Sequence, residues 1–164
     1  VLKHGDIIST DEYTLETIHT PGHASNHLCF YIEKYKCLLT GDHIMDGSTV
    51  VIAPPDGNMT EYINSLKQLE QYDISYFAPG HGNYMEEPSK TIQSIIRHRL
   101  SRESKVLRCI EKNQQSNLDE LLPLVYNDVS EMLHPIARMS LLAHIIKLEH
   151  DGKIRNIENC YSSF

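Results

Sequence analysis

Several kinds of pattern are missing from this sequence, and each absence excludes a class of protein. No run of about 18 apolar residues occurs, so no membrane-spanning helix is expected. The four cysteines show no C-x-x-C spacing, which argues against a disulfide framework and is typical of a reducing, cytoplasmic setting. No glycine-rich phosphate loop and no G-x-S-x-G elbow is present, which excludes P-loop and serine-hydrolase mechanisms.

Positive charge is also scarce, although it is unevenly distributed. The net charge is −7, and residues 1–88 carry 4 Lys and Arg against 13 Asp and Glu. This excess of negative charge argues against a general affinity for nucleic acid. Residues 89–112, in contrast, carry seven basic side chains and two acidic ones. That segment has two interpretations: a solvated helix face, or a patch that meets an anionic substrate.

The first 80 residues predict a sheet of short strands. The apolar, β-prone runs are Thr14–His19, Leu28–Glu33, Cys37–Thr40 and Ile74–Ala78, with a hairpin turn at Glu33–Lys36. The run from Leu28 is apolar at nearly every position, which is typical of a strand covered on both faces. After a Pro-Pro-Asp-Gly loop, Thr60 is expected to cap a helix that continues to Leu69.

The second half of the chain predicts mostly helix. A long basic helix over 89–112 is followed by a polar break, so we expect a domain boundary between residues 115 and 116. Helices are then expected over 118–126 and 135–151, and the strand-like residues after them would begin a wing. This order is typical of a small winged helix-turn-helix domain over 116–164. A capping bundle that packs on the preceding sheet is the alternative.

Three sharp turns present a histidine or an aspartate directly after a strand-like run. Thr-Pro-Gly precedes His23, Leu-Thr-Gly precedes Asp42, and Ala-Pro-Gly precedes His81. Strands of one sheet that end at the same edge bring such residues together. Two imidazoles and one carboxylate suit zinc or a similar metal, and three protein ligands plus water are typical of catalytic zinc. The sequence therefore predicts a metal site.

The strings "TPGH", "GD" and "PGHG", in this order, resemble the third, fourth and fifth metal motifs of the metallo-β-lactamase superfamily. The string "HRLSRE" at 98–103 and the tail are similar to the β-lactamase-like protein 2 group within it. The resemblance implies an α/β (α+β) fold: the C-terminal half of an αβ/βα sandwich over 1–115, followed by a mostly helical, winged-helix-like domain. It also implies two zinc ions, with His23 on the first, Asp42 bridging both and His81 on the second.

The activity that the resemblance implies is hydrolysis by a metal-bound hydroxide. The substrate would be a small-molecule ester or thioester, or the phosphodiester of a single-stranded RNA, as for an endoribonuclease. Four residues are candidates for contacting it: His43, Tyr62, His98 and Arg99.

The chain departs from the family at its most diagnostic motif, because no His-x-His-x-Asp-His string occurs. The resemblance also implies that the family's general acid and base lie outside this chain. We therefore expect the chain, which starts at Val1, to be the C-terminal portion of a longer hydrolase and inactive alone. Its partner would be the missing N-terminal half or, through an open sheet face, a second copy. The alternative is a non-catalytic module in which the tail binds nucleic acid or protein.

Overall fold

The computed structural model describes residues 1–113 and 115–164, and it divides into two compact units. The first unit comprises residues 1–50 and 56–96, and the second comprises residues 51–55 and 97–164. The helix α2 (Pro88–Asn113) contributes to both. Gln114, inside the predicted polar break, lies outside the described residues. The boundary expected between residues 115 and 116 stays a prediction.

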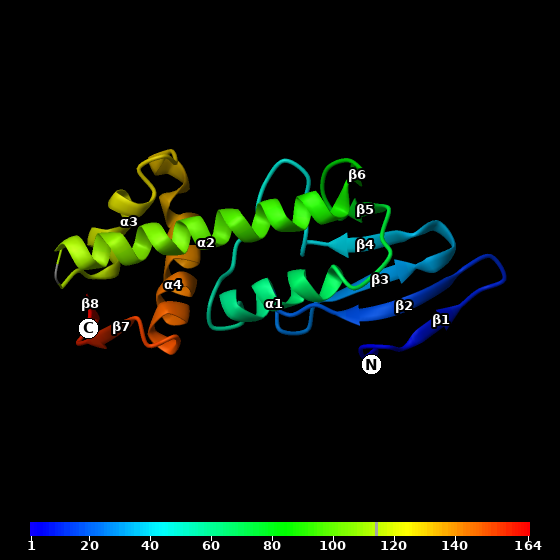
Figure 1. Cartoon of the computed structure of the whole chain (residues 1–164), viewed down its shortest axis with the longest axis horizontal. Helices are drawn as coiled ribbons and strands as arrows, with labels where there is room; N and C mark the ends of the chain where they lie inside the picture. The colour runs from blue at the N-terminus through cyan, green and yellow to red at the C-terminus, as the bar shows by residue number, and fades with distance from the viewer. Residues whose placement is uncertain (114) are drawn as a thin grey trace. The chain divides into compact units, whose positions relative to one another are not determined.

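The first unit is built on a six-stranded sheet in which the strands follow one another in chain order (Figure 1). The strands are β1 (Ile7–Ser9), β2 (Thr14–His19), β3 (Leu28–Ile32), β4 (Cys37–Gly41), β5 (Tyr76–Pro79) and β6 (Met85–Glu86). All neighbouring pairs are antiparallel except β4 and β5, which are parallel. The four predicted strands are confirmed, with end points that differ by no more than two residues.

The predicted hairpin between β3 and β4 is confirmed. A single 3₁₀ turn over Glu33–Tyr35 reverses the chain, and Lys36 closes it in the left-handed conformation at φ 48°. The turn sets a register in which Tyr31 lies opposite Leu38. Leu38 in turn lies opposite Phe77 of β5, so these three side chains share one face of the sheet. All three are buried, and this face is where the core of the first unit lies.

The helix α1 (Met59–Leu69) covers that face, but it begins at a different cap from the one predicted. Asn58 is the N-cap, because its side-chain oxygen accepts hydrogen bonds from the backbone N–H groups of Thr60 (2.9 Å) and Glu61 (3.1 Å). Thr60 therefore lies inside the first turn, and its assignment as the cap was wrong. An asparagine two residues before a threonine offers an equally good acceptor. The predicted apolar stripe of the helix is buried, Tyr62 and Leu66 included.

The opposite face of the sheet is only partly covered by the described residues. Phe30, Leu39 and Ala78 lie opposite one another across β3, β4 and β5. Each is half-buried, and together with Leu28 they line a cleft of about 810 Å³. The expectation that the run from Leu28 is covered on both faces was therefore wrong for this structure, because only its alternate residues, Cys29 among them, are buried.

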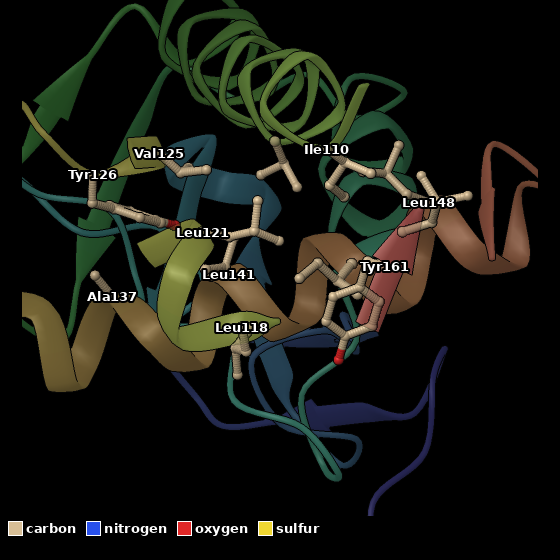
Figure 2. Packing of buried hydrophobic residues seen from close by; sticks show 12 residues of the cluster. Ile110, Leu118, Leu121, Val125, Tyr126, Ala137, Leu141, Leu148 and Tyr161 are labelled. Atoms are coloured by element: carbon tan, nitrogen blue, oxygen red, sulfur yellow. The ribbon is translucent and has the colours of Figure 1, made fainter. Parts of the chain in front are cut away.

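The second unit has the order of a winged helix. After the C-terminal part of α2 come α3 (Leu118–Val125), the 3₁₀ turn η2 (Glu131–Leu133) and α4 (His134–His150). The antiparallel ribbon of β7 (Ile154–Ile157) and β8 (Cys160–Ser163) completes it. The helices meet in an apolar core to which α2 contributes Ile110, α3 Leu121 and α4 Leu141 (Figure 2). The predicted helices and the first strand of the wing are confirmed. No described helix could cross a membrane, since none combines the necessary length and hydrophobicity.

Candidate metal centre

The three predicted ligands leave the sheet at the same edge. β3 is antiparallel to both β2 and β4, so β2 and β4 run in the same direction, and β5 is parallel to β4. The carboxyl ends of these three strands therefore meet at one edge, where chemistry-bearing residues commonly collect in α/β proteins. His23 follows β2, Asp42 follows β4 and His81 follows β5.

Asp42 and His81 lie together at this edge. Gly41 is opposite Pro79 in the parallel pair, and the Gly80 backbone N–H donates to the Gly41 carbonyl at 2.8 Å. The Nε2 atom of His81 is consequently 3.4 Å from Oδ1 of Asp42. Gly80 permits this approach, because a Cβ atom there would lie only 3.2 Å from the Gly41 carbonyl group.

The spacing of this pair is the one that two ligands of a single ion require. Ligand atoms about 2.0–2.1 Å from a tetrahedral zinc ion are separated by about 3.4 Å. Both side chains remain accessible, with 44% of Asp42 and 74% of His81 exposed. In donor chemistry, distance and accessibility, the pair fits a divalent metal ion.

β3 lies between β2, the strand before His23, and β4, the strand before Asp42. Two strand spacings, about 10 Å, lie between the ends of β2 and β4, and His27 precedes β3 in this gap. The hydroxyl of Thr20 and Nδ1 of His27 are hydrogen-bonded at 2.8 Å. Burial lowers the pKa of His27, His23 lowers it further, and the Asp42 carboxylate acts in the opposite direction. Among the described residues, no three His, Cys, Asp or Glu side chains are positioned to hold a metal ion as they stand.

His43 and Tyr62 pack behind the edge and do not open onto it. Both are fully buried, and the Tyr62 hydroxyl donates to the His43 carbonyl oxygen at 2.9 Å. Their rings meet edge to face with centroids 4.9 Å apart. Burial, followed by the proximity of His27 and His23, lowers the pKa of His43 to about 3, so its imidazole is neutral. In this structure neither side chain offers an atom to a substrate, and their assignment as substrate-binding residues stays a prediction.

Asp46 is a positioning residue that the sequence reasoning missed. Its Oδ2 atom accepts hydrogen bonds from the backbone N–H and the side-chain amide of Asn83, both at 3.1 Å. Its own N–H donates to the His81 carbonyl oxygen at 3.4 Å. Gly82 has φ +94°, and a Cβ atom there would lie 2.5 Å from Cβ of Asp46. Asp46 therefore holds the loop that presents His81. The only sequence signal was the Asp-Gly pair at 46–47, which is typical of a turn.

The turn that presents His23 is fixed against α1. The Gly22 carbonyl oxygen accepts from the Asn58 N–H at 2.8 Å, and the Ser65 hydroxyl donates to the Pro21 carbonyl oxygen at 2.7 Å. Gly22 has φ +139°, and a Cβ atom there would lie 2.3 Å from Cα of Tyr62. Only glycine allows the turn to approach the helix this closely.

The other two candidates for substrate contact, His98 and Arg99, belong to the second unit. His98 is exposed, and its pKa is lowered by partial burial and by the nearby charges of Arg99 and Arg102. Arg99 is buried, with 4% of its surface exposed. They and the Asp42–His81 pair belong to different units, so the contact of His98 and Arg99 with a substrate stays a prediction.

Several basic side chains of the helix form ion pairs with carboxylates of this chain. The Arg102 guanidinium donates to both oxygens of Asp128, at 2.7 and 2.9 Å, and Lys105 donates to the same carboxylate at 3.2 Å. Lys90 pairs with Glu87 on the surface. These pairs reduce the charge that the helix presents to an anionic substrate and favour the interpretation as a solvated, self-paired face.

Comparison with known proteins identifies two family segments. Residues 1–81 match the metallo-beta-lactamase superfamily, and residues 118–161 match the beta-lactamase associated winged helix domain. This chain is thus a metallo-β-lactamase superfamily domain segment joined to the winged helix domain associated with that superfamily. The predicted resemblance and the predicted fold class are confirmed.

Individual relatives extend over nearly the whole chain. A "Beta-lactamase-like protein 2 homolog" of Drosophila melanogaster is 31% identical over 156 residues, which is 94% of this chain and 52% of that protein. An "Atrochrysone carboxyl ACP thioesterase" of Emericella nidulans is 24% identical over 156 residues, covering 93% of this chain and 50% of that enzyme. The chain therefore spans about half the length of these curated relatives.

Two crystal structures share the fold. A metallo-beta-lactamase family protein from Thermus thermophilus superposes with a TM-score of 0.87 and 20% identity, over 99% of this chain and 54% of that one. A beta-lactamase domain protein from Burkholderia ambifaria gives 0.89 and 18% identity, over 99% and 52%. At these identities the likeness concerns the fold alone.

Proposed function

We propose that this chain supplies one side of the metal centre of a hydrolase. Asp42 and His81 bind one ion, and His23 binds a second ion whose other ligands come from outside these 164 residues. The observation that carries the proposal is the 3.4 Å separation of Asp42 Oδ1 and His81 Nε2 at an accessible sheet edge. Zinc is the metal we expect, because imidazole and carboxylate donors suit it.

A bound metal of this kind polarises the group to be cleaved and acidifies water at neutral pH. The residues of this chain hold the site in shape. Asp46 fixes the loop of His81 through Asn83, and α1 fixes the turn of His23 through Ser65. The buried, neutral His43 packs beside Asp42 and adds no positive charge to a place that must bind a cation.

A thioester or ester is the substrate class we propose. One support is the relative whose name is that of a thioesterase, 24% identical over 93% of this chain. A second support is the acidic balance of residues 1–88, which opposes the approach of a polyanion such as RNA. A third is the pairing of Arg102 and Lys105 with Asp128, which removes basic charge from the helix that would meet RNA. We place the reaction in the cytoplasm, in keeping with four free cysteines.

The partly covered sheet face is where we propose that the other half of an αβ/βα sandwich packs. Phe30, Leu39 and Ala78 form an apolar row there, above a cleft of about 810 Å³. A second sheet laid on this row would bury it and bring further ligands to the edge that carries Asp42 and His81. We therefore propose that the active enzyme requires residues beyond these 164.

A zinc titration of the 164-residue chain by isothermal calorimetry tests the ligand assignment. We expect saturable binding near one ion per chain and a large loss of affinity in His81→Ala and in Asp42→Ala. His150→Ala is the matched control, because it removes an exposed histidine (82%) of the second unit and should leave binding unchanged. No saturable binding, or equal affinity in all variants, would contradict the assignment.

The reaction is tested on a longer form of the protein that includes the sequence preceding Val1. We expect it to hydrolyse a thioester, to lose that activity with a chelator and to regain it with zinc. Cleavage of single-stranded RNA in preference to thioesters would refute the proposed substrate class but not the proposed metal centre. Hydrolysis that continues at full rate in the chelator would refute the metal mechanism. Metal-independent binding of RNA without turnover would favour the non-catalytic module instead.

A further inference from the structure

The helix α4 of the second unit is apolar on both of its sides. Its inner side packs into the core, where Ala137, Leu141 and Leu148 point toward α2 and α3 (Figure 2). Its outer side carries a second apolar row, which we call the outer stripe: Ile136, Met139 and Ile146 are exposed, and Leu142 beside them is half-buried and also contacts the core. Helices on the surface of a soluble protein normally present polar residues outward. A helix with apolar residues all round normally has neighbours on both sides, whereas Met139 and Ile146 on the outer side of α4 are 49% and 45% exposed.

The outer stripe is continuous and accessible. Met139, Leu142 and Ile146 fall within an arc of about 60° around the helix axis. Met139 is 49% exposed and Ile146 is 45% exposed, while Leu142 is half-buried. Met132, in the 3₁₀ turn directly before the helix, is 89% exposed. A spacing of three and four residues between apolar positions is the pattern with which one helix packs lengthwise against another.

We infer that the outer stripe is the dimer interface of this chain, with α4 of a second copy packed antiparallel against it about a two-fold axis that passes close to Leu142. The self-complementary charges beside the stripe are the reason to choose a second copy. Arg138 and Glu149 lie on the same flank, about 20° apart around the helix and about three turns apart along it.

In an antiparallel two-fold pair, each flank faces the same flank of the other helix, so residue i contacts residue j and residue j contacts residue i. Arg138 of one copy then lies opposite Glu149 of the other, twice in each dimer. The Arg138 guanidinium already binds Asp119 of its own chain at 2.7 Å through Nε. A guanidinium has five N–H donors, so it can serve both carboxylates.

Other kinds of partner fit the stripe less well. A helix that lies on a membrane carries Lys and Arg along its polar face, and a helix that reads nucleic acid carries them toward the phosphates. The two permanently charged basic side chains of α4 are already paired, Arg138 with Asp119 and Lys147 with the buried Glu103 at 2.9 Å, and the exposed His150 lies 3.9 Å from Asp151. The outer flanks add Glu149 to this. The surroundings of the stripe thus oppose an anionic partner.

Sedimentation velocity on the full 164-residue chain, over a range of concentrations, tests the inference. We expect a monomer–dimer equilibrium, and Met139→Glu should raise the dimer dissociation constant by about tenfold or more. The matched control is Ile157→Glu on β7, where the replaced side chain is 53% exposed and lies outside the stripe. The control should dimerise like the wild type. Both positions face outward, so circular dichroism and the thermal midpoint should show that each variant is folded.

A cross-linking experiment tests the two-fold geometry. Because Leu142 lies near the proposed axis, Leu142→Cys should form a disulfide-linked dimer under mild oxidation. The two half-buried native cysteines, Cys109 and Cys160, are first replaced by serine. Ile157→Cys in the same background should stay unlinked.

Three results would overturn the inference. The first is a wild-type chain that remains monomeric at every concentration. The second is a dimer that persists unchanged in Met139→Glu, which would show that another surface, such as the open sheet face of the first unit, joins the copies. The third is a monomeric chain that co-sediments with phosphatidylcholine vesicles and loses this binding in Met139→Glu, which would show that the stripe meets lipid.

Discussion

Replacing Gly22 by alanine tests whether α1 fixes the turn that presents His23. Gly22 has φ +139°, a conformation that L residues rarely adopt, and the added Cβ atom would lie 2.3 Å from Cα of Tyr62 and 2.5 Å from its N. Non-bonded carbon atoms normally approach to about 3.5–4.0 Å. The turn and the helix must therefore separate by more than an ångström, because the obstacle is helix backbone and cannot rotate away.

The expected cost follows from these contacts. A backbone held in a sparsely populated conformation costs about 1–3 kcal/mol. Separation would also break the hydrogen bonds from Asn58 N to Gly22 O and from Ser65 Oγ to Pro21 O, each worth about 0.5–1.5 kcal/mol. Gly22→Ala should thus lower the free energy of unfolding by about 2–6 kcal/mol, which is large for a domain with a total stability of about 5–15 kcal/mol.

Urea unfolding followed by circular dichroism measures this cost, and Gly47→Ala is the matched control. Gly47 also has a positive φ, +71°, but a Cβ atom there would meet nothing within 4 Å. Its substitution should cost only the conformational strain of about 1–2 kcal/mol. Ser65→Ala, which removes one of the two hydrogen bonds without a clash, should cost about 1 kcal/mol and remain folded.

Equal costs for Gly22→Ala and Gly47→Ala would refute the reasoning, because the two sites differ in the contact with α1. Because the proposed ion of the 164-residue chain is held by Asp42 and His81, the folded fraction of both glycine variants should bind zinc like the wild type.

Three further predictions concern the second unit. Leu121→Ala empties a fully buried site and should cost about 2–5 kcal/mol in urea unfolding, whereas Leu124→Ala on the same helix, at 44% exposure, should stay within about 0.5 kcal/mol. Burial, and then neighbouring cations, lower the pKa of His144 from 6.5 to about 3, so the unfolded chain binds more protons between these values and stability should fall as the pH drops from 6.5 toward 3. His144→Leu should remove up to about 1.4 kcal/mol per pH unit of that slope in pH-dependent unfolding curves. Arg102→Lys removes the bidentate hydrogen bond to the Asp128 carboxylate and should lower the free energy of unfolding by about 1–3 kcal/mol. Arg97→Lys, at an exposed position, should change it little.

Local chemistry made most of the elements predictable. Thr14–His19 was predicted to the residue, because a β-prone run ends there at a Thr-Pro-Gly turn. The helices of the second unit were predicted within a residue or two, since Pro135 and the Asp-Gly pair at 151–152 mark the ends of α4. β1 and β6 were missed because they are only three and two residues long and exist through pairing with a neighbour. The start of α1 was misplaced because Asn58 and Thr60 are both good caps, and only the chain geometry selects between them.

By itself, the sequence determined that His23, Asp42 and His81 each follow a strand at a sharp turn, since apolar runs and Pro-Gly pairs act over a few residues. Only the tertiary structure decided which of these side chains meet. Parallel pairing of β4 with β5 places Asp42 beside His81, while the antiparallel β3 lies between β4 and β2, the strand before His23. Strand order and register depend on contacts between residues far apart in the chain, and no local pattern encodes them.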